Sequence, residues 1–545
     1  MDLSYMNKIT NVLTDKKLWI LLSIACAIRL YIWYVTPVLA TDGILFINIA
    51  THFTEGNFYE GLKHPYHPLY ALLISLCTIT GLEFEISGRL VSLFSGTLSV
   101  AVVYVFGKKM FDPKIAFVSA LLLTFHPYAA RLSANVRCDS TYLLFYLVGF
   151  GLGYIAIISK KPYVFFLTGI ASAFAYLTRP EGLSIIIIVS IWTIIQLIVS
   201  GKPYWKNNVR MLCLLLIGFL IFSSPYILYL KHYTNSWTLT QKKQLSKISG
   251  IDTIRDVLYD SEELETNKAY NTGVDTSSQT KTTIKDNRDG KWHTYQSKST
   301  SKYSPKKKYL ESLIKVLNQI IITLHYPFFI FLIIGIICSI RDLKNKAVNY
   351  YIASFVTLFL FILYFLQATS GYASYRHAMS PVIVMLFWAG MGVNNTYNWL
   401  IRKKMPGWQQ MQSEGGIFSK TGIIFLCLII ALFLPKTLKS FMSNGIYKDA
   451  GMWIKAFYPE EPIIFADEPR VAFYAAVQRL KIPKKSSYTE IIQYARQNKI
   501  NLMVVTKGII DYDKDFFSKI NHNEVKELLE LVRKEKKIVI YKILD

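Results

Sequence analysis

The sequence predicts a multi-pass α-helical membrane protein that ends in a small α/β domain. Of its 545 residues, 52% are hydrophobic, and the mean hydropathy is +0.30. These apolar residues gather in long runs, several of them close to the ~20 residues that a helix needs to cross the hydrocarbon of a bilayer. Basic residues fall mostly in the short connections between the runs, as is typical of cytoplasmic loops in membrane proteins.

Nine long apolar runs predict most of the membrane helices. They cover residues 18–35, 86–106, 142–158, 183–199, 212–230, 320–340, 350–366, 382–393 and 423–434. The first run follows Lys16-Lys17 and is followed by Val-Leu-Ala, loosely like a signal-peptide cleavage site. Because it is long and rich in Trp and Tyr for a signal peptide, we expect a retained helix.

Six basic groups in short loops predict the orientation of the chain. They are Lys16-Lys17, Lys108-Lys109, Lys160-Lys161, the group Lys202, Lys206 and Arg210, the group Arg341, Lys344 and Lys346, and Arg402-Lys403-Lys404. All six can face the cytoplasm if residues 116–127 cross the membrane and residues 68–80, too short to cross unaided, lie in the interface or re-enter it. The result is a fold with about 11–13 transmembrane helices. With about 11 crossings, an odd number, the N-terminus is cytoplasmic and the C-terminus is outside.

The charge and the cysteines exclude several other classes of protein. The net charge of +25 could suggest nucleic acid, but the position of the basic residues between apolar runs favours membrane topology instead. The six cysteines are scattered and show no spacing typical of zinc sites or disulfide frameworks. The sequence has no Walker loop or dinucleotide fingerprint, so ATP-driven transport has no support.

We predict two domains: a membrane domain over residues 1–435, with a long polar outer loop at about 231–308, and an extracytoplasmic α/β domain over residues 436–545. In the loop, the stretch NTGVDTSSQTKTTIKDNRDG has few apolar residues and is expected to be loosely ordered. In the second domain, PIIFAD, INLMVVT and KKIVIYKIL are typical of buried strands. SYTEIIQYARQ and NEVKELLELVRKE are typical of amphipathic helices.

Asp42 is the first candidate for chemistry. It directly follows the first membrane run, and the residues after it predict a helix lying in the membrane interface, with Leu45, Ile49 and Phe53 on one face. A carboxylate at that place could act as a general base. The alternative is that Thr41 or Asp42 caps the helix, and a capping carboxylate could still present its second oxygen to a ligand.

Three further clusters lie at predicted outer ends of the membrane runs. KHPYHPLY contains Lys63, His64 and His67, with prolines that restrict the residue before them. These histidines could bind a phosphate or a metal, or form only a rigid turn. Arg131, Arg137 and Asp139 come from RLSANVRCDS, and Arg179 and Glu181 from LTRPEG.

A fourth cluster, SYRHAMSP, contains Arg376. Arginines at an outer membrane surface could bind a lipid phosphate through two parallel hydrogen bonds, or only anchor the chain at the interface.

The order and spacing of these motifs resemble the membrane-embedded C-type (GT-C) glycosyltransferases. TDGILFINIATHF, HPLYALL, RLVSLFSGTLSVAVVYVFGKKMF, RLSANVRCDSTYLLF, YLTRPEGL and YRHAMSPV follow in the family's order. The chain is most similar to the branch that joins protein O-mannosyltransferases with bacterial lipid A aminoarabinose transferases. The resemblance covers roughly residues 15–395 and is clearest over 40–185.

The resemblance implies a membrane glycosyltransferase that moves a sugar from a polyprenyl-phosphate donor to an acceptor outside. It implies catalytic roles for Asp42 and Asp139. We expect Lys63, Arg137 and Arg376 to bind the donor phosphate, and His64, His67, Arg131, Arg179 and Glu181 to line the pocket. Many relatives have Asp-Glu where this chain has Asp42-Gly43, so participation of a divalent metal ion stays open.

The expected partners are the lipid-linked donor, membrane lipids and an acceptor that is a protein, a lipid or a glycan, with no role for nucleic acid. The bacterial branch implies the cell inner membrane, with the active site in the periplasm. A polymerase or ligase of lipid-diphosphate-linked glycans is the alternative enzyme. A lipid or sugar transporter is the alternative of another class; its signature would be ionisable residues deep within the spans, and Arg29 is the only clear charge within the first apolar run.

Overall fold

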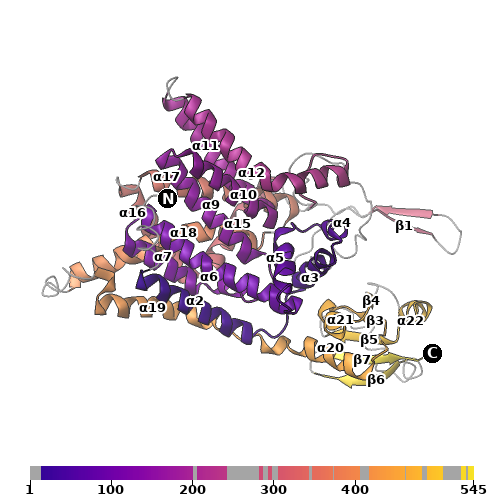
Figure 1. Cartoon of the computed structure of the whole chain (residues 1–545). Coiled ribbons are helices and arrows are strands. Elements are labelled where there is room, and N and C mark those ends of the chain that lie inside the picture. Colours follow the sequence, from indigo (N-terminus) through magenta and orange to yellow (C-terminus); the bar gives the residue numbers. More distant parts are fainter. Residues whose placement is uncertain are drawn as a thin grey trace. The chain divides into compact units, whose positions relative to one another are not determined.

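The computed structural model describes residues 14–200, 205–241, 281–285, 292–296, 305–342, 346–371, 373–404, 416–460, 462–480, 488–506, 529–535 and 538–544. The described chain is mostly helical (Figure 1). Its internal contacts divide it into two compact units, one of Met1–Ile221 with Tyr397–Asp545 and one of Phe222–Thr396. The boundary predicted at residues 435/436 falls within the last helical turn of α19 and stays a prediction.

The helices of the first unit follow each other closely up to residue 200. They are α2 (Lys16–Tyr34), α3 (Thr41–Thr54), α4 (Phe58–Leu62), α5 (Leu69–Thr78), α6 (Phe84–Met110), α7 (Pro113–Phe125), α8 (Pro127–Leu132), α9 (Asp139–Ser159), α10 (Pro162–Thr178), the 3₁₀ turn η1 (Pro180–Gly182) and α11 (Leu183–Ser200). Helix α6 packs against α2, α5, α7 and α9, and α9 packs against α10. The elements η5 (Gly416–Phe418) and α19 (Lys420–Thr437) also belong to this unit, whereas α12 (Trp205–Thr234) and α18 (Tyr375–Lys404) cross the boundary between the two.

The multi-pass prediction is confirmed in the part of the chain that the structure describes. Seven helices are long and apolar enough to cross a membrane, and nine if each of two bent pairs is one span. Three shorter apolar helices, Leu69–Thr78, Pro113–Phe125 and Pro162–Thr178, accompany them. The segment predicted to lie in the interface contains the 10-residue α5, which at 1.5 Å per residue is too short to cross hydrocarbon.

Local sequence signals set several helix ends. The Asp15 carboxylate caps α2 by accepting the Lys17 N–H at 3.1 Å. Asp112 caps α7 in the same way, and Pro113 occupies the first turn, where its missing N–H costs nothing. Arg179 precedes Pro180 and has an extended backbone, because a proline disfavours the helical conformation in the residue before it. Helix α10 therefore ends at Thr178, and Pro180 begins the turn η1.

The second unit contains α15 (Pro305–Leu324), α16 (Tyr326–Arg341), α17 (Lys346–Ser370) and most of α18. The pair α15 and α16 bends by 101° at His325, which has a positive φ of 76°. Gly335 and Gly392 let α16 and α18 approach closely, because a Cβ atom on Gly335 would lie 1.8 Å from the Trp388 carbonyl oxygen.

The polar loop prediction needs a correction in this unit. Residues 281–285 form strand β1 (Lys281–Lys285), which pairs antiparallel with β2 (Trp292–Gln296). Threonine and aromatic residues favour this pairing, with Thr283 opposite Thr294. The rest of the stretch predicted to be loosely ordered lies outside the described residues.

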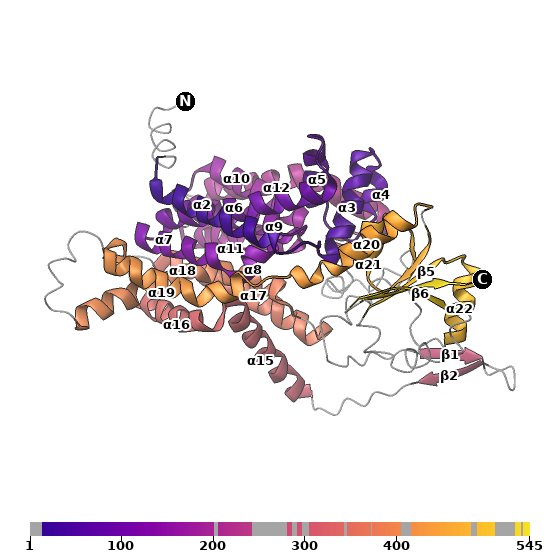
Figure 2. The same ribbon diagram turned by 90° about the horizontal axis from the view of Figure 1, so that it is seen from below.

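The C-terminal part of the first unit is the predicted α/β domain. After η6 (Met442–Asn444) come α20 (Ile446–Phe457), β3 (Ile464–Ala466), α21 (Pro469–Ala475), β4 (Arg479–Leu480), α22 (Tyr488–Gln497), β5 (Leu502–Thr506), β6 (Leu529–Lys534) and β7 (Ile538–Ile543). The five strands, all labelled in Figure 1, have the order β4-β3-β5-β7-β6; β4, β3 and β5 are parallel, and β7 and β6 continue antiparallel. Figure 2 shows the same domain from below, with α22 beside the sheet.

Both faces of this sheet are covered. Ile464, Ala466, Leu502 and Val504 point to a core shared with α20 and α21, and Phe465, Met503 and Val505 point to a core shared with α22. This explains why the strands are continuously apolar rather than alternating.

The helix predicted for NEVKELLELVRKE is wrong over residues 529–534. These residues form the edge strand β6, which pairs with β7 with a register shift between Leu531 and Arg533. Their local helix propensity is overridden because β7 offers an open strand edge. The first half of the predicted helix lies outside the described residues.

Candidate active site

Asp42 lies in the first turn of α3, directly after the extended segment that leaves α2, and it is half-buried. The capping interpretation is wrong, because the N-cap of α3 is Ala40, which forms no side-chain capping hydrogen bond. A carboxylate in a first turn is still stabilised by the positive end of the helix dipole. The predicted interface pattern holds in part: Ile49 and Phe53 are buried, and Leu45 is half-buried.

The turn over residues 133–138 contacts the start of α3. The Asn135 Oδ1 atom accepts a hydrogen bond from the Ala40 N–H at 2.8 Å, and its Nδ2 atom donates to the Val38 carbonyl at 3.3 Å. The fully buried Val136 side chain packs against Gly43 of α3 and Gly88 of α6. A Cβ atom on Gly43 would lie 3.0 Å from the Val136 Cβ, which explains a glycine after Asp42 in this chain.

Tyr70 connects the His-Pro cluster to the same turn. Its hydroxyl group donates to the Gly88 carbonyl at 2.9 Å and lies 2.7 Å from the Ser92 Oγ atom, which donates to the Arg137 carbonyl at 3.1 Å. Tyr70 also packs edge-on against Phe46 of α3, at 5.0 Å between ring centroids. The cluster, the turn and α3 therefore form one packed region.

Asp139 and Arg179 form a buried ion pair at the start of α9. The Arg179 Nη1 atom donates to the Asp139 Oδ1 atom at 2.5 Å, and Arg179 also contacts Glu181 through Nη2 at 2.7 Å and Nε at 3.3 Å. The guanidinium lies over the Tyr142 ring at 5.5 Å. Protonation of Asp139 would disrupt this pair, so the geometry suits an ionised carboxylate that holds Arg179 rather than a proton acceptor.

His67 lies in the loop before α5 and packs against α10. Its ring is 1% exposed and meets Tyr176 of α10 edge-on, with centroids 5.0 Å apart. Tyr176 lies in the last turn of α10, three residues before Arg179, which directly follows that helix. His64 is half-buried in the loop between α4 and α5.

The other predicted cations have different surroundings. The Lys63 Nζ atom forms an ion pair with the Glu60 Oε1 atom at 2.5 Å. Arg131 donates to the Lys436 carbonyl and lies over the Phe441 ring at 4.7 Å, so it holds the connection from α19 to the C-terminal domain. Arg376 lies in the second compact unit, which is described by itself.

Arg137 differs from these cations. It is half-buried, and within the described ranges no carboxylate forms an ion pair with its guanidinium. Its backbone is fixed through Ser92, and it follows Val136, which touches α3. Among the predicted phosphate-binding residues of this unit, Arg137 is therefore the best placed to receive an external anion.

Sequence reasoning missed the residues that hold the site together. Arg89 is 2% exposed, pairs with Glu85 at 2.8 Å and donates to the Thr36 carbonyl at 2.9 Å and the Ala134 carbonyl at 3.4 Å. It thus ties the segment before Asp42 to the turn before Arg137. Two sequence signals could have drawn attention to Arg89: it is a charge within the apolar run 86–106, and it lies four residues after Glu85.

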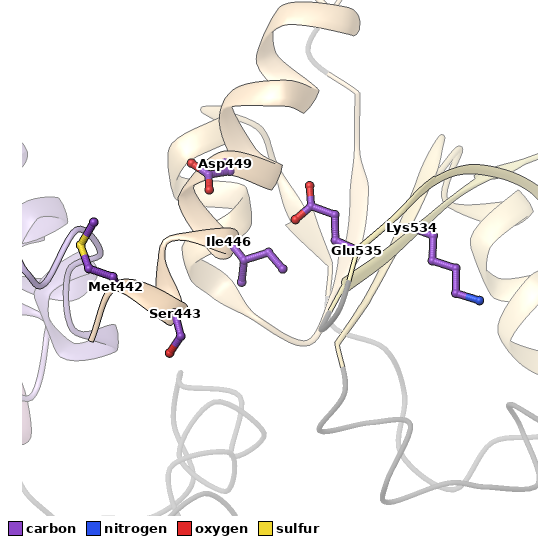
Figure 3. Close-up of a pocket in the computed structure, with 6 residues that line it drawn as sticks. All are labelled: Met442, Ser443, Ile446, Asp449, Lys534 and Glu535. Atoms are coloured by element: carbon purple, nitrogen blue, oxygen red, sulfur yellow. The ribbon is translucent and has the colours of Figure 1, made fainter. Parts of the chain in front are cut away.

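Two further features concern the binding of ligands. The described residues contain no group of three or more His, Cys, Asp or Glu side chains that could hold a metal ion. A shallow groove in the C-terminal region is lined by Met442, Ser443, Ile446, Asp449, Lys534 and Glu535, none of them a predicted site residue (Figure 3).

Comparison with known proteins supports the predicted resemblance. Residues 63–229 match the family model described as dolichyl-phosphate-mannose-protein mannosyltransferase. No curated protein matches the chain in sequence.

Two solved structures share its fold. The chain is similar to ArnT from Cupriavidus metallidurans bound to undecaprenyl phosphate, at a TM-score of 0.56 and 11% identity, over 96% of this chain and 97% of that one. It is also similar to the archaeal oligosaccharyltransferase AglB from Archaeoglobus fulgidus in complex with an inhibitory peptide and a dolichol-phosphate. That similarity has a TM-score of 0.53 and 12% identity, and it covers 90% of this chain and 69% of that one. The chain therefore shares the fold of these two membrane proteins, and its residues 63–229 match the mannosyltransferase family model.

Proposed function

We propose that this protein transfers a sugar from a polyprenyl-phosphate donor to an acceptor outside the cytoplasm, with Asp42 as the general base. The observation that carries the proposal is the packed region in which the half-buried Asp42 and Arg137 are held on adjoining segments, with no ion pair to Arg137 among the described residues. The family match over residues 63–229 and the undecaprenyl phosphate bound by the similar ArnT support a lipid-phosphate donor.

The chemistry follows from the two groups. A neutral acceptor hydroxyl is a poor nucleophile, so Asp42 takes its proton while the hydroxyl oxygen forms a bond to the anomeric carbon. The bond from that carbon to the phosphate oxygen breaks, and the electron pair leaves with the polyprenyl phosphate. Direct displacement inverts the anomeric centre.

The phosphate that leaves gains negative charge and needs hydrogen-bond donors rather than a proton. We assign this role to Arg137, whose guanidinium can form two parallel hydrogen bonds with phosphate oxygens. Arg179 is held by Asp139 and Glu181, and we assign it to the wall of the pocket together with His67.

The reaction is proposed to take place on the periplasmic side of the inner membrane. Contacts within the first unit support a site on one side of the membrane and basic loops on the other side. Asp15 pairs with Lys108 at 2.7 Å, and Lys17 lies over the Phe418 ring at 3.4 Å, so these basic groups gather at the end of α2 opposite to Asp42.

The test starts from the lipid that co-purifies with the full-length protein in detergent. Native mass spectrometry and lipid extraction identify this lipid, and its glycosylated form then serves as the donor in a transfer assay. We expect Asp42→Asn to bind the lipid but to transfer sugar about 10²- to 10⁴-fold more slowly, since the base is lost. Glu55→Gln is the matched control, because it makes the same chemical change at the exposed opposite end of α3.

Full transfer by Asp42→Asn would overturn the assignment of the base. A co-purified diphosphate-linked glycan would favour the polymerase or ligase instead. Failure to bind any polyprenyl lipid, even when the extract is added back, would reject both enzymes and favour transport.

A further inference from the structure

We propose that Tyr474, in the C-terminal domain, is a positioning residue for Asp42, so that this domain is part of the catalytic unit. The inference rests on the proposed function of Asp42. Tyr474 belongs to α21 and is 8% exposed, and α21 contacts α3 within the first unit. Its hydroxyl oxygen accepts a hydrogen bond from the Leu39 N–H at 3.1 Å.

The segment from Val35 to Ala40 explains why this hydrogen bond matters. The segment joins two helices without regular secondary structure, and its residues Val35, Val38, Leu39 and Ala40 are buried, so its backbone groups need hydrogen-bond partners from outside the segment. The membrane domain supplies some of them: Arg89 binds the Thr36 carbonyl, and Asn135 binds both the Val38 carbonyl and the Ala40 N–H.

The C-terminal region supplies two more partners. The Phe441 N–H donates to the Val35 carbonyl at 3.0 Å, and Tyr474 accepts from Leu39. Leu39 immediately precedes Ala40, the N-cap of α3, and lies three residues before Asp42. A shift of the Leu39 backbone would therefore move the first turn of α3 and its carboxylate.

The surroundings of Tyr474 hold its ring and hydroxyl group in place. The ring is part of a buried core with Val38, Leu39, Phe46 and Val136, the residues that frame the start of α3. Lys448 of α20 lies over the ring at 4.9 Å, and its Nζ atom lies 3.8 Å from the Glu85 Oε2 atom. Burial, together with the nearby charge of Glu85, raises the pKa of the Tyr474 phenol above its usual value, so the neutral form persists at physiological pH.

The test uses Tyr474→Phe in the full-length protein, which removes the hydroxyl group and keeps the ring. Tyr494→Phe is the matched control: it makes the same change in the same domain on a side chain that is 41% exposed. Two quantities are measured: hydrogen exchange of the peptide that covers residues 36–42, and kcat and KM for the donor identified by lipid extraction.

We expect Tyr474→Phe to speed exchange in this peptide and to lower kcat, each by about 3- to 10-fold, with little change in the donor KM. The control should change neither quantity. Exchange at α21 itself should stay close to that of the wild type, because the ring still fills the core.

Unchanged exchange at residues 36–42 would overturn the inference. Faster exchange with an unchanged kcat would also overturn it, because the contact would then be structural only. If the wild type transfers no sugar from the lipid donor, the proposed function fails separately, and the positioning of a catalytic Asp42 falls with it even where exchange shows that Tyr474 holds the segment.

Discussion

At the scale of single residues, the cations of the candidate site differ in whether a carboxylate of the protein already pairs with them. Arg179 is held by Asp139 and Glu181, and Lys63 is paired with Glu60. A charge already satisfied by a partner inside the protein has little to gain from a ligand, because binding would first have to break the existing pair. The half-buried Arg137 has no such partner within the described residues and is the stronger candidate for contact with the donor phosphate.

Asp467 in the C-terminal domain allows a prediction about pH. Burial raises the pKa of its carboxyl from 3.8 to about 6; the charge of Glu468 adds to the effect, and a hydrogen bond from Thr506 opposes it. Because the pKa is higher in the folded state, the stability from protonation is present below pH 3.8 and is lost as the pH rises through about 6. At pH 8 the ionised form costs up to about 3 kcal/mol.

We therefore expect Asp467→Asn to stabilise the domain at pH 8 and to have a smaller effect at pH 4.5. Asparagine keeps an oxygen that can accept from Thr506. The measurement is hydrogen exchange at β3 and β5, as the ratio of variant to wild type at each pH. Asp449→Asn, the same change at an exposed aspartate of α20, is the control. A ratio that is the same at both pH values would contradict the prediction.

At the scale of elements, the site depends on how closely α3 and α6 approach the turn over residues 133–138. Val136 packs against Gly43 and Gly88, and a Cβ atom on Gly88 would lie 2.8 Å from the Val136 Cγ1 atom. Only a residue without a side chain fits at either glycine without a shift of the turn. Packing against Val136 thus explains why a glycine, Gly43, follows Asp42.

This packing predicts a compensating pair of substitutions. Gly88→Ala should overpack the contact and destabilise the protein by about 1–3 kcal/mol, with a loss of transfer activity, because the turn that carries Arg137 moves. Val136→Ala removes both Cγ atoms and leaves a cavity.

The double variant Gly88→Ala/Val136→Ala should be less impaired than the sum of the two single variants, since the new methyl group occupies the space that the valine vacates. Unfolding in detergent and transfer rates for all three variants measure this coupling. Additive effects would show that the glycine and the valine are not in the predicted contact.

At the scale of the whole molecule, long-range contacts join the C-terminal domain to the end of the membrane domain that holds Asp42. The Leu39–Tyr474 hydrogen bond joins residues 435 positions apart in the sequence. Since Leu39 lies just before Asp42, the C-terminal domain and the candidate active site must be on one side of the membrane. The basic residues Lys17 and Lys108 lie at the other end of α2 and α6.

Cysteine labelling tests this topology. In a cysteine-free background, an impermeant maleimide should label Glu55→Cys and Gln493→Cys in intact spheroplasts, because both positions are exposed and predicted to be periplasmic. Lys109→Cys, also exposed, should react only after lysis. Labelling of Lys109→Cys in intact cells, or protection of either other position, would contradict the predicted orientation.

The sequence by itself determined the class of protein, the positions of the membrane helices and most of the candidate site residues. Apolar runs and charged loops are local signals, since each helix must satisfy its own backbone within the bilayer and therefore shows its length in its composition. The strands β3, β5 and β7 were predictable for the same reason: their apolar residues are continuous. Asp42, Arg137 and Asp139 were found through motifs at the ends of these runs.

The tertiary structure alone decided how these residues are partnered. It showed that Arg179 is held by Asp139, that Val136 fits between two glycines, that residues 529–534 form an edge strand, and that Tyr474 reaches Leu39. None of these contacts is local: each joins segments that are distant in the sequence or depends on a neighbouring strand. The strength of a hydrogen bond, an ion pair or a packing contact depends on which groups share a buried space, and composition and periodicity do not carry that information.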